Sequence, residues 1–471
     1  MTRRALGAVV AAVAVFGLAA CGGSSSSNSS GTPSTGGSSD LAKQCPTDAL
    51  AKATKPVKIT YWHAMERANE DALKKITKEF NASQSDVQVT LVNQGGYNDA
   101  LTKFRSVAGT SDAPDLLQIE DTATQQLIDS QAIVPAQACL EAAKSDLSDV
   151  LPRVLAYYTV GNVLYPMPFN VSNPVFYYNK IAFRKAGLDP EKPPTTWDEL
   201  TTDAKKIQAA GYKYGFYYKR DPWVLEQFLA LNGEPYVNNG NGRERRATAV
   251  TFDTPTARKL FEQLHTLVAT KVAATNSASG PSGFDNLTSI CQGDNAMTID
   301  TSAALGTVTQ VLGTGGCPAK IEVGVAPLPG GNGQGGTLVG GAANYIAKGS
   351  DPAKVAAAYR FAQYLTKADV QAEWAAATGY IPISKAAAQS KVMTDLWAKT
   401  PGYKVAYDQI LDGKDNVATA GPVIGDYEGV RNAMTDALES FLVGSTAPDA
   451  ALTRAKQKAD AAISAYNARV G

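Results

Sequence analysis

The chain is poor in the side chains on which most catalytic and metal sites depend. Its 471 residues include only two histidines, His63 and His265, and five cysteines. Zinc sites and nucleophilic triads draw on histidine, so these classes of site have little material here. The stretch "WHAME" contains one histidine and lacks the His-Glu-x-x-His pattern of zinc proteases. We expect no metal and no cofactor. A hydrolase that uses two carboxylates stays open, because such acids can come from any part of a chain.

Excess charge of either sign is also missing. Lys and Arg together number 44, as do Asp and Glu, so the formal net charge is zero. A nucleic-acid-binding protein normally carries a basic surface, and an acidic disordered tail needs a block of like charge. We therefore expect no nucleic-acid partner. A hydrophobic content of 44% is sufficient for a sizeable folded core.

Long apolar runs are confined to the first twenty residues. Arg3 and Arg4 precede an apolar segment of small residues that ends in "LAAC", and a Ser/Gly/Asn-rich tract follows. This order predicts a signal peptide over 1–20, a lipidated Cys21 and a flexible tether over 21–45. The alternative is an ordinary signal peptide with an incidental cysteine. No later run is long and apolar enough to span a membrane, so we expect an exported body anchored through its lipid.

Four cysteines remain once Cys21 is set aside. In an exported protein an even number favours two disulfides, for which three pairings are possible. We favour Cys45–Cys139 and Cys291–Cys317. The alternative is that one or both pairs stay reduced and buried.

The hydrophobic pattern alternates between strand-like and helix-like segments. "VKITYW" and "VQVTLV" alternate with period two, and the segments after each of them have apolar residues at helical spacing. A second set of such units begins at "PVFYYN", and the chain after Pro352 is helical in pattern. This order predicts an α/β protein with a largely parallel sheet.

Four sequence blocks resemble a known family. They are "YWHAME", "NKIAFRKAGLDPEKPPTTWDEL", "GDNAMT" and "TGYIPISKAA". Their order and spacing are similar, from about residue 56 to the end, to the extracellular solute-binding proteins that serve ABC importers. The nearest branch binds glycerol 3-phosphate and glycerophosphodiesters.

The resemblance implies a two-lobed fold of the maltose-binding-protein type, with a ligand cleft between lobes joined by two or three crossings. Lobe one would comprise 46–172 plus 342–385, and lobe two 173–341 plus 386–471. It further implies a monomeric binder, not an enzyme, that closes on a small hydroxylated solute and docks on membrane permease subunits. An extracytoplasmic hydrolase and a structural lipoprotein are the alternatives from other classes.

The resemblance also assigns candidate ligand contacts, each of which has a purely structural alternative. Asp121 would accept hydrogen bonds from adjacent hydroxyls, or cap a helix, and Glu120 could exchange roles with it by one register step. Trp223 would be a stacking platform, or a part of the core. The remaining candidates, for which packing, turn or helix-start roles are the alternatives, are Glu66, Tyr97, Ser172, Ser302, Gly341 and Tyr380.

Two departures from the branch pattern concern the phosphate. Arg220-Asp221 stands where the branch has another tryptophan, and Val423 stands where it has an arginine for the phosphate. Arg220 would therefore replace that arginine, or else the solute is a neutral mono- or oligosaccharide. Arg431 is expected on a helix eight residues beyond Val423, which makes it a poor substitute.

Overall fold

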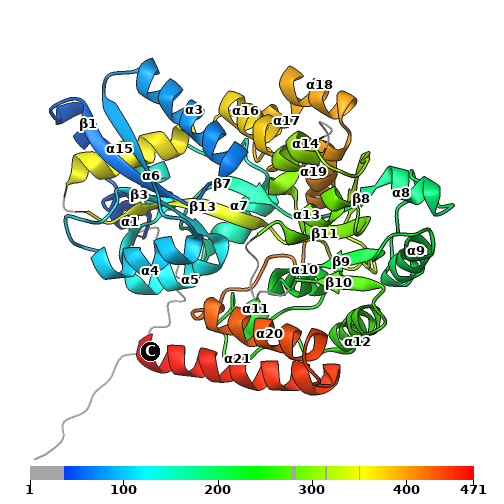
Figure 1. Cartoon of the computed structure of the whole chain (residues 1–471). Helices are drawn as coiled ribbons and strands as arrows, with labels where there is room; N and C mark the ends of the chain where they lie inside the picture. Colours follow the sequence, from blue (N-terminus) through cyan, green and yellow to red (C-terminus); the bar gives the residue numbers. More distant parts are fainter. Residues whose placement is uncertain (1–36, 277–282, 313–315, 350, 471) are drawn as a thin grey trace, which may run out of the picture. The chain divides into compact units, whose positions relative to one another are not determined.

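The strands of the computed structural model form two main sheets (Figure 1). The structure describes residues 37–276, 283–312, 316–349 and 351–470. The first sheet has the order β2-β1-β3-β13-β4, with β7 also paired to β13. Its strands are β1 (Val57–His63), β2 (Val87–Asn93), β3 (Leu116–Glu120), β4 (Ile133–Val134), β7 (Met167–Ser172) and β13 (Gly340–Ala347).

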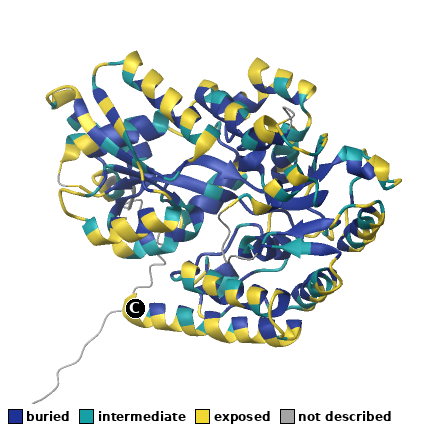
Figure 2. Ribbon diagram, in the orientation of Figure 1, coloured by how far each residue is buried: buried dark blue, intermediate teal, exposed yellow. Residues whose placement is uncertain are grey.

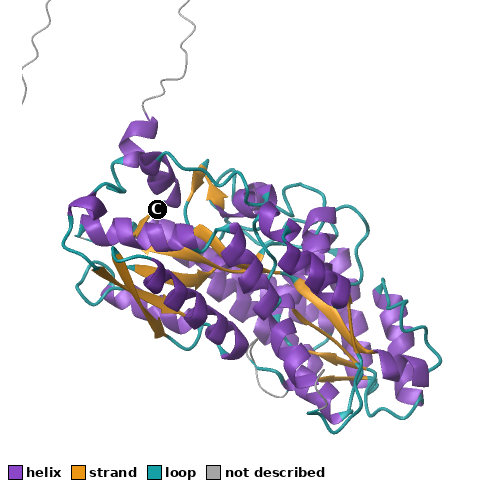
Figure 3. Ribbon diagram, turned by 90° about the horizontal axis from the view of Figure 1, so that it is seen from above, coloured by secondary structure: helices purple, strands orange, loops and turns teal. Residues whose placement is uncertain are grey.

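The second sheet has the order β10-β9-β11-β8-β12. Its strands are β8 (Pro174–Asn179), β9 (Phe216–Tyr218), β10 (Ala273–Thr275), β11 (Met297–Thr301) and β12 (Val323–Pro327). A small hairpin consists of β5 (Thr159–Val160) and β6 (Val163–Leu164). Seen from above, the strands gather in two groups with helices around each (Figure 3). We refer to the elements around the first and second sheets as lobe one and lobe two.

Both sheets are mixed, whereas the sequence predicted a largely parallel sheet. Strand β1 is parallel to β2 and β3, and β9 is parallel to β10 and β11. Strand β13 is antiparallel to β3, β4 and β7, and β8 is antiparallel to β11 and β12. The antiparallel members flank the points where the chain passes between sheets, and the direction of a strand that enters from the other lobe is not visible in its own hydrophobic pattern.

Helices cover both sheets and also fill the space where the lobes meet. In lobe one the helical elements are α1 (Gly37–Ala42), α2 (Ala49–Lys52), α3 (Arg67–Ser83), α4 (Tyr97–Val107), η1 (Asp121–Ala123), α5 (Thr124–Ser130), α6 (Ala136–Ala143), α7 (Pro152–Tyr158), α15 (Pro352–Tyr364) and α16 (Ala368–Thr378). Those of lobe two and of the junction are α8 (Lys180–Lys185), α9 (Trp197–Ala209), α10 (Pro222–Leu231), α11 (Asn238–Asn241), α12 (Pro255–Ala269), α13 (Asp285–Gln292), η2 (Ser302–Ala304), α14 (Leu305–Leu312), α17 (Lys385–Gln389), α18 (Lys391–Lys399), α19 (Gly402–Asp412), α20 (Tyr427–Leu442) and α21 (Pro448–Val470).

Local sequence explains the best-defined elements. Helix α9 begins with a capping box, in which the Thr196 hydroxyl accepts from the amide of Glu199 and the Glu199 carboxylate accepts from that of Thr196. Strand β8 is buried along its whole length, as expected for a central strand that is covered on both faces. Strand β1 alternates between buried and more exposed positions. The buried positions follow the sheets in Figure 2.

The first passage between the lobes is a single residue. Strand β7 ends at Ser172 and β8 begins at Pro174, so Asn173 alone joins the two sheets. Its amide group donates to the Ala406 carbonyl at 2.9 Å and to the Thr337 hydroxyl at 3.3 Å, and the residue is fully buried. Thr337 belongs to the Gly-rich second passage between β12 and β13. One side chain therefore ties both passages together.

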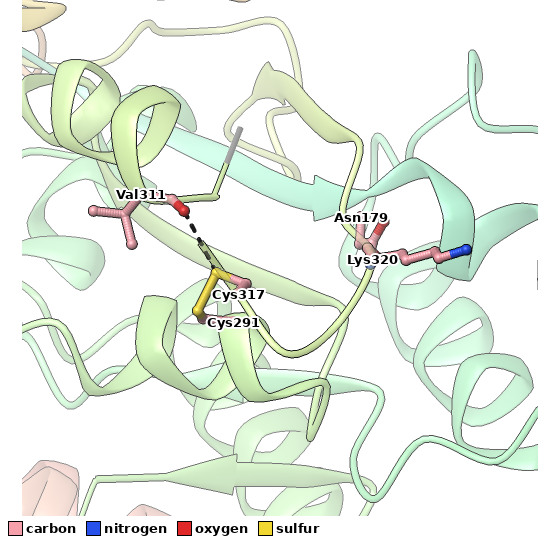
Figure 4. Close-up of a disulfide and its surroundings, with 5 residues drawn as sticks. All are labelled: Asn179, Cys291, Val311, Cys317 and Lys320. Atoms are coloured by element: carbon pink, nitrogen blue, oxygen red, sulfur yellow. Dashed lines mark hydrogen bonds between the residues drawn. A yellow bond between two sulfur atoms is a disulfide. The ribbon is translucent and has the colours of Figure 1, made fainter. Parts of the chain in front are cut away.

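Two disulfides cross-link the chain, in the pairing that we expected from the sequence. Cys45–Cys139 fastens the N-terminal segment of the described structure to α6. Cys291–Cys317 joins the end of α13 to the segment that leads into β12, close to the Asn179–Lys320 hydrogen bond (Figure 4). Residues 1–36, with the predicted signal peptide and Cys21, lie outside the described residues. The predicted tether reached residue 45, but helix α1 and the buried Cys45 already belong to the folded body.

Candidate functional site

The carboxyl ends of the parallel strands in both lobes carry the polar candidates. In lobe one, Glu66, Tyr97 and Asp121 follow β1, β2 and β3. In lobe two, Arg220 follows β9 and Ser302 follows β11. Open α/β sheets bind ligands at this edge, because loops and helix starts converge there.

The neighbouring acids Glu120 and Asp121 face different partners. The Tyr157 hydroxyl donates a hydrogen bond to Asp121 Oδ2, and Asp121 is buried. Burial raises the pKa of Asp121 to about 8, the charge of Glu120 adds to the shift, and Arg431 opposes it. Glu120 instead accepts from Arg431 at 2.6 Å. Burial therefore favours the protonated form of Asp121, whereas Glu120 is half of an ion pair.

Two tyrosines of lobe one meet around an asparagine. The Asn170 amide donates to the Tyr97 hydroxyl at 3.2 Å, and the Tyr380 hydroxyl lies near both of these side chains. The Tyr380 ring stacks on Trp374 with centroids 5.3 Å apart. Burial raises the pKa of both tyrosines, and the charge of Glu120 adds to each shift. Tyr97, Tyr380 and Glu120 therefore share one region.

Trp223 lies against the second passage between the lobes. It stands in the first turn of α10 and is half-buried. A Cβ added at Gly340 would come within 2.7 Å of its ring, so the indole packs on a position that admits no side chain. Ser172 pairs with Gly340 in the β7–β13 ladder. Gly341 has φ +97°, and a Cβ there would lie 2.1 Å from the Asn170 carbonyl oxygen, so only glycine fits.

Ser302 connects lobe two to the same region. The backbone N–H of Ser302 donates to the backbone carbonyl of Asn173 at 2.9 Å. The Ser302 hydroxyl accepts from the backbone N–H of Asn173 at 3.4 Å. A Cβ at Gly379 would come within 2.6 Å of the Ser302 carbonyl oxygen, which places Ser302 beside the turn that presents Tyr380. Ser302 thus contacts both the first passage between the lobes, at Asn173, and the turn that carries Tyr380.

Within the described chain, two candidates lie apart from this group. Glu66 is exposed at the start of α3. Arg220 is 1% exposed, and its Nε donates to Asn276 while Nη1 lies 4.0 Å from Glu439 of α20. Its guanidinium is thus directed at the C-terminal half of α20, and the resemblance gave no sign of this orientation.

Arg431 lies where the sequence gave it no role. From α20 it donates through Nε and Nη2 to the two oxygens of Glu226, both at 2.8 Å, and through Nη1 to Glu120 of lobe one. The Tyr427 hydroxyl also donates to Glu226, at 3.0 Å. These carboxylates raise the pKa of Arg431 although burial opposes the shift. The helix that was expected to keep Arg431 away instead delivers it to Glu120.

Lys219, which directly follows β9, is paired as well. Lys219 Nζ lies 3.4 Å from Asp300, which also accepts from Asn286 at 2.9 Å. Burial raises the pKa of Asp221 to about 6, with Lys219 and Arg431 opposing the shift. Each of these two cations thus has at least one carboxylate partner.

Two hollows adjoin this edge. Val423 lines a small hollow of about 10 Å³ together with Asp121, Tyr157 and Arg243. A larger pocket of about 260 Å³ opens between the start of α3 and helices α13 and α14, where the Arg67 guanidinium lies 4.3 Å from the centre of the Phe284 ring. In the described part of the chain, no group of three or more His, Cys, Asp or Glu side chains is placed to hold a metal ion. No described helix is both long enough and apolar enough to cross a membrane.

Comparison with known proteins identifies the family. The model of the bacterial extracellular solute-binding proteins matches residues 75–404. The chain belongs to this family. The sn-glycerol-3-phosphate-binding periplasmic protein UgpB of Yersinia pseudotuberculosis is 30% identical over 423 residues, which cover 87% of this chain and 93% of that protein. UgpB of Salmonella typhimurium is 31% identical over 420 residues, with 86% and 92% covered.

Solved structures of solute-binding proteins share the fold. The GacH receptor of Streptomyces glaucescens, solved unliganded and with acarbose, has a TM-score of 0.72 at 22% identity. UgpB of Mycobacterium tuberculosis, in complex with glycerophosphocholine, has a TM-score of 0.71 at 20% identity. Each match covers 87% of this chain and 99% of the other. The two-lobed fold of the maltose-binding-protein type is confirmed, and the chain is a bacterial extracellular solute-binding protein.

Two residues of this solute-binding protein escaped the sequence reading. Asn173 received no prediction, and Arg431 was expected on a helix as a poor substitute for the missing arginine. For Arg431 the sequence did contain a signal. Arg431 lies one helical turn after Tyr427, so both side chains are on the same face of α20. For Asn173 the only signal was its place between two strand-like runs.

Proposed function

We propose that this solute-binding protein captures a small hydroxylated solute between its lobes and closes on it. The observation that carries the proposal is the reach of Arg431 from lobe two to Glu120 of lobe one, beside Asp121, Tyr97 and Tyr380. Carboxylates and tyrosine hydroxyls suit the hydroxyls of a polyol, and the half-buried Trp223 offers a flat face for a sugar ring. Closure follows because the solute contacts both lobes only in the closed state.

The rest of the transport role belongs to the same proposal. Cys21 would carry the lipid that holds the exported protein at the outer face of the cytoplasmic membrane. Lobe one would comprise 46–172 plus 342–385, and lobe two 173–341 plus 386–471. The closed, monomeric protein would deliver its solute to membrane permease subunits without chemical change, as the relatives named as binding proteins support.

The solute class is open between two types. The relatives named for sn-glycerol 3-phosphate support a phosphate ester, and the structural neighbour solved with acarbose supports a saccharide. A thermal-shift screen of glycerol 3-phosphate, glycerophosphocholine and a panel of mono- and oligosaccharides tests both. A bound solute stabilises the folded state by mass action and raises the melting temperature.

The residue test uses Trp223→Ala, with Tyr212→Ala as control. Loss of a stacking face weakens binding by about ten-fold or more while the unfolding midpoint of the free protein changes little. Tyr212 is a partly buried aromatic residue of lobe two that packs under Lys185, so its loss leaves affinity unchanged. Equal affinity of wild type and Trp223→Ala would remove Trp223 from the site. Turnover of a bound glycoside or phosphodiester by pure protein would favour the hydrolase instead.

A further inference from the structure

Arg431 is a cation at the centre of the proposed site, and its guanidinium is held from one side. Glu226, whose side chain is 1% exposed, takes both Nε and Nη2 in a bidentate pair. Such a fork fixes the plane of the guanidinium, because two parallel hydrogen bonds leave it no freedom to rotate. The remaining edge, Nη1, is thereby aimed at lobe one.

Glu120 occupies that edge. Its Oε1 accepts from Nη1 at 2.6 Å, and its side chain is 27% exposed, so it can exchange its partner for a solute. The charge of Glu120 contributes to the raised pKa of Asp121, Tyr97 and Tyr380. The Glu120 carboxylate therefore lies among the lobe-one candidates for solute contact. A solute that touches these residues also lies next to Glu120.

A phosphate ester would meet unfavourable charges at this position. An anion is held well by a guanidinium with unoccupied donors, whereas two carboxylates already use donors of all three Arg431 nitrogens. Two further cations follow β9. Lys219 lies against Asp300 and is close to Asp221, and the buried Arg220 is directed away towards α20, with Nη1 4.0 Å from Glu439. Like charges at short range in a partly buried site disfavour the charged form of each.

We propose that Glu120 sets the charge selectivity of the site. It neutralises the free edge of Arg431, excludes phosphate esters and leaves carboxylate and tyrosine acceptors for the hydroxyls of an uncharged saccharide. This inference rests on the proposed function. It makes Glu120 the specificity-determining residue and Arg431 the group whose availability it controls.

The test is a gain of binding, which a misfolded variant cannot produce. Isothermal titration of the wild type and of Glu120→Gln is carried out with glycerol 3-phosphate and with uncharged mono- and oligosaccharides. The wild type binds a saccharide at least about ten-fold more tightly than glycerol 3-phosphate. Glu120→Gln removes the negative charge that faces Nη1 and gains about ten-fold or more in affinity for glycerol 3-phosphate. Glu373→Gln is the matched control, because Glu373 pairs with Lys75 on the surface of lobe one, and it changes neither affinity.

The outcomes separate the two claims. A wild type that binds glycerol 3-phosphate more tightly than any saccharide, with no further gain in Glu120→Gln, overturns the role of Glu120 and leaves solute capture intact. Failure of the wild type and of the variant to bind any of these probes overturns solute capture and the selectivity claim together. Loss of the gain in the double variant Glu120→Gln, Arg431→Lys supports Arg431 as the partner of the phosphate.

Discussion

At the scale of single residues, two adjacent carboxyls have opposite environments. Asp121 is buried against the Tyr157 hydroxyl, whereas Glu120 points at Arg431. Burial penalises the charged form of Asp121, and the neighbouring charge of Glu120 adds to that penalty. Of these two adjacent carboxyls, one is held where burial disfavours its charge, and the other is paired with a guanidinium.

The raised pKa of Asp121 makes the stability of the protein depend on pH. The pKa of Asp121 is about 8 in the folded state, whereas the ordinary pKa of an aspartate is 3.8. Between about pH 4 and pH 8 the unfolded chain has lost this proton while the folded chain keeps it, so the free energy of unfolding falls as pH rises. The full contribution of Asp121 to the free energy of unfolding is present only below about pH 4.

Asp121→Asn removes this dependence. Urea unfolding of wild type and variant at pH 5, 7 and 8.5 is expected to show the variant gaining on the wild type as pH rises. The relative gain is a few kcal/mol at most, since one pKa unit corresponds to about 1.4 kcal/mol. A difference between the two proteins that stays constant from pH 5 to 8.5 would contradict the assignment.

At the scale of elements, local signals predicted what local forces determine. The alternation of β1, the buried run of β8 and the capping box of α9 are all visible in the sequence. The direction of β13 and the pairing of the short strands β9 and β10 are not, because the partners that define them lie far away along the chain. Element type is encoded locally, and sheet order is not.

The candidate site shows the same division. The loops that carry Tyr97, Asp121 and Tyr380 could be named from the sequence, because strand ends and a family pattern locate them. The orientation of Arg220 and the reach of Arg431 could not, because each depends on which helix packs opposite. A pattern assigns a residue to an element, and tertiary packing decides what its side chain meets.

The two disulfides are expected to stabilise the elements that they join by different amounts. Cys45–Cys139 spans 94 residues and Cys291–Cys317 spans 26. The chain-entropy model gives roughly 4.7 kcal/mol for the longer loop and roughly 3.5 kcal/mol for the shorter one. Urea unfolding of the two paired Cys→Ser variants should show the larger loss for Cys45 and Cys139. The reverse order would mean that residual structure in the unfolded chain dominates.

At the scale of the whole molecule, the lobes are joined by hydrogen bonds other than the Arg431–Glu120 pair. Asp129 of lobe one accepts from both Nη atoms of Arg246, at 2.7 and 2.9 Å, and from the Tyr466 hydroxyl at 2.9 Å. Arg243 donates to the carbonyls of Tyr157 and Thr159 at 2.9 and 3.0 Å. Opening of the cleft on this side has to break such bonds, so they favour the closed arrangement before any solute arrives.

Removing one of these ties should shift the protein towards the open state and weaken solute binding from a distance. Arg246→Ala deletes the bidentate pair with Asp129 and leaves Asp121, Trp223 and Arg431 untouched. A closed state that is populated less often lowers the apparent affinity in proportion, and loss of this partly buried pair corresponds to about a three- to ten-fold change. Small-angle scattering of the free protein should show a larger radius of gyration, and calorimetry the weaker binding. Arg258→Ala is the control, because its partners Asp253 and Asp449 lie in lobe two with it. If Arg246→Ala matches the control in both measurements, the closed state is held by the solute site alone.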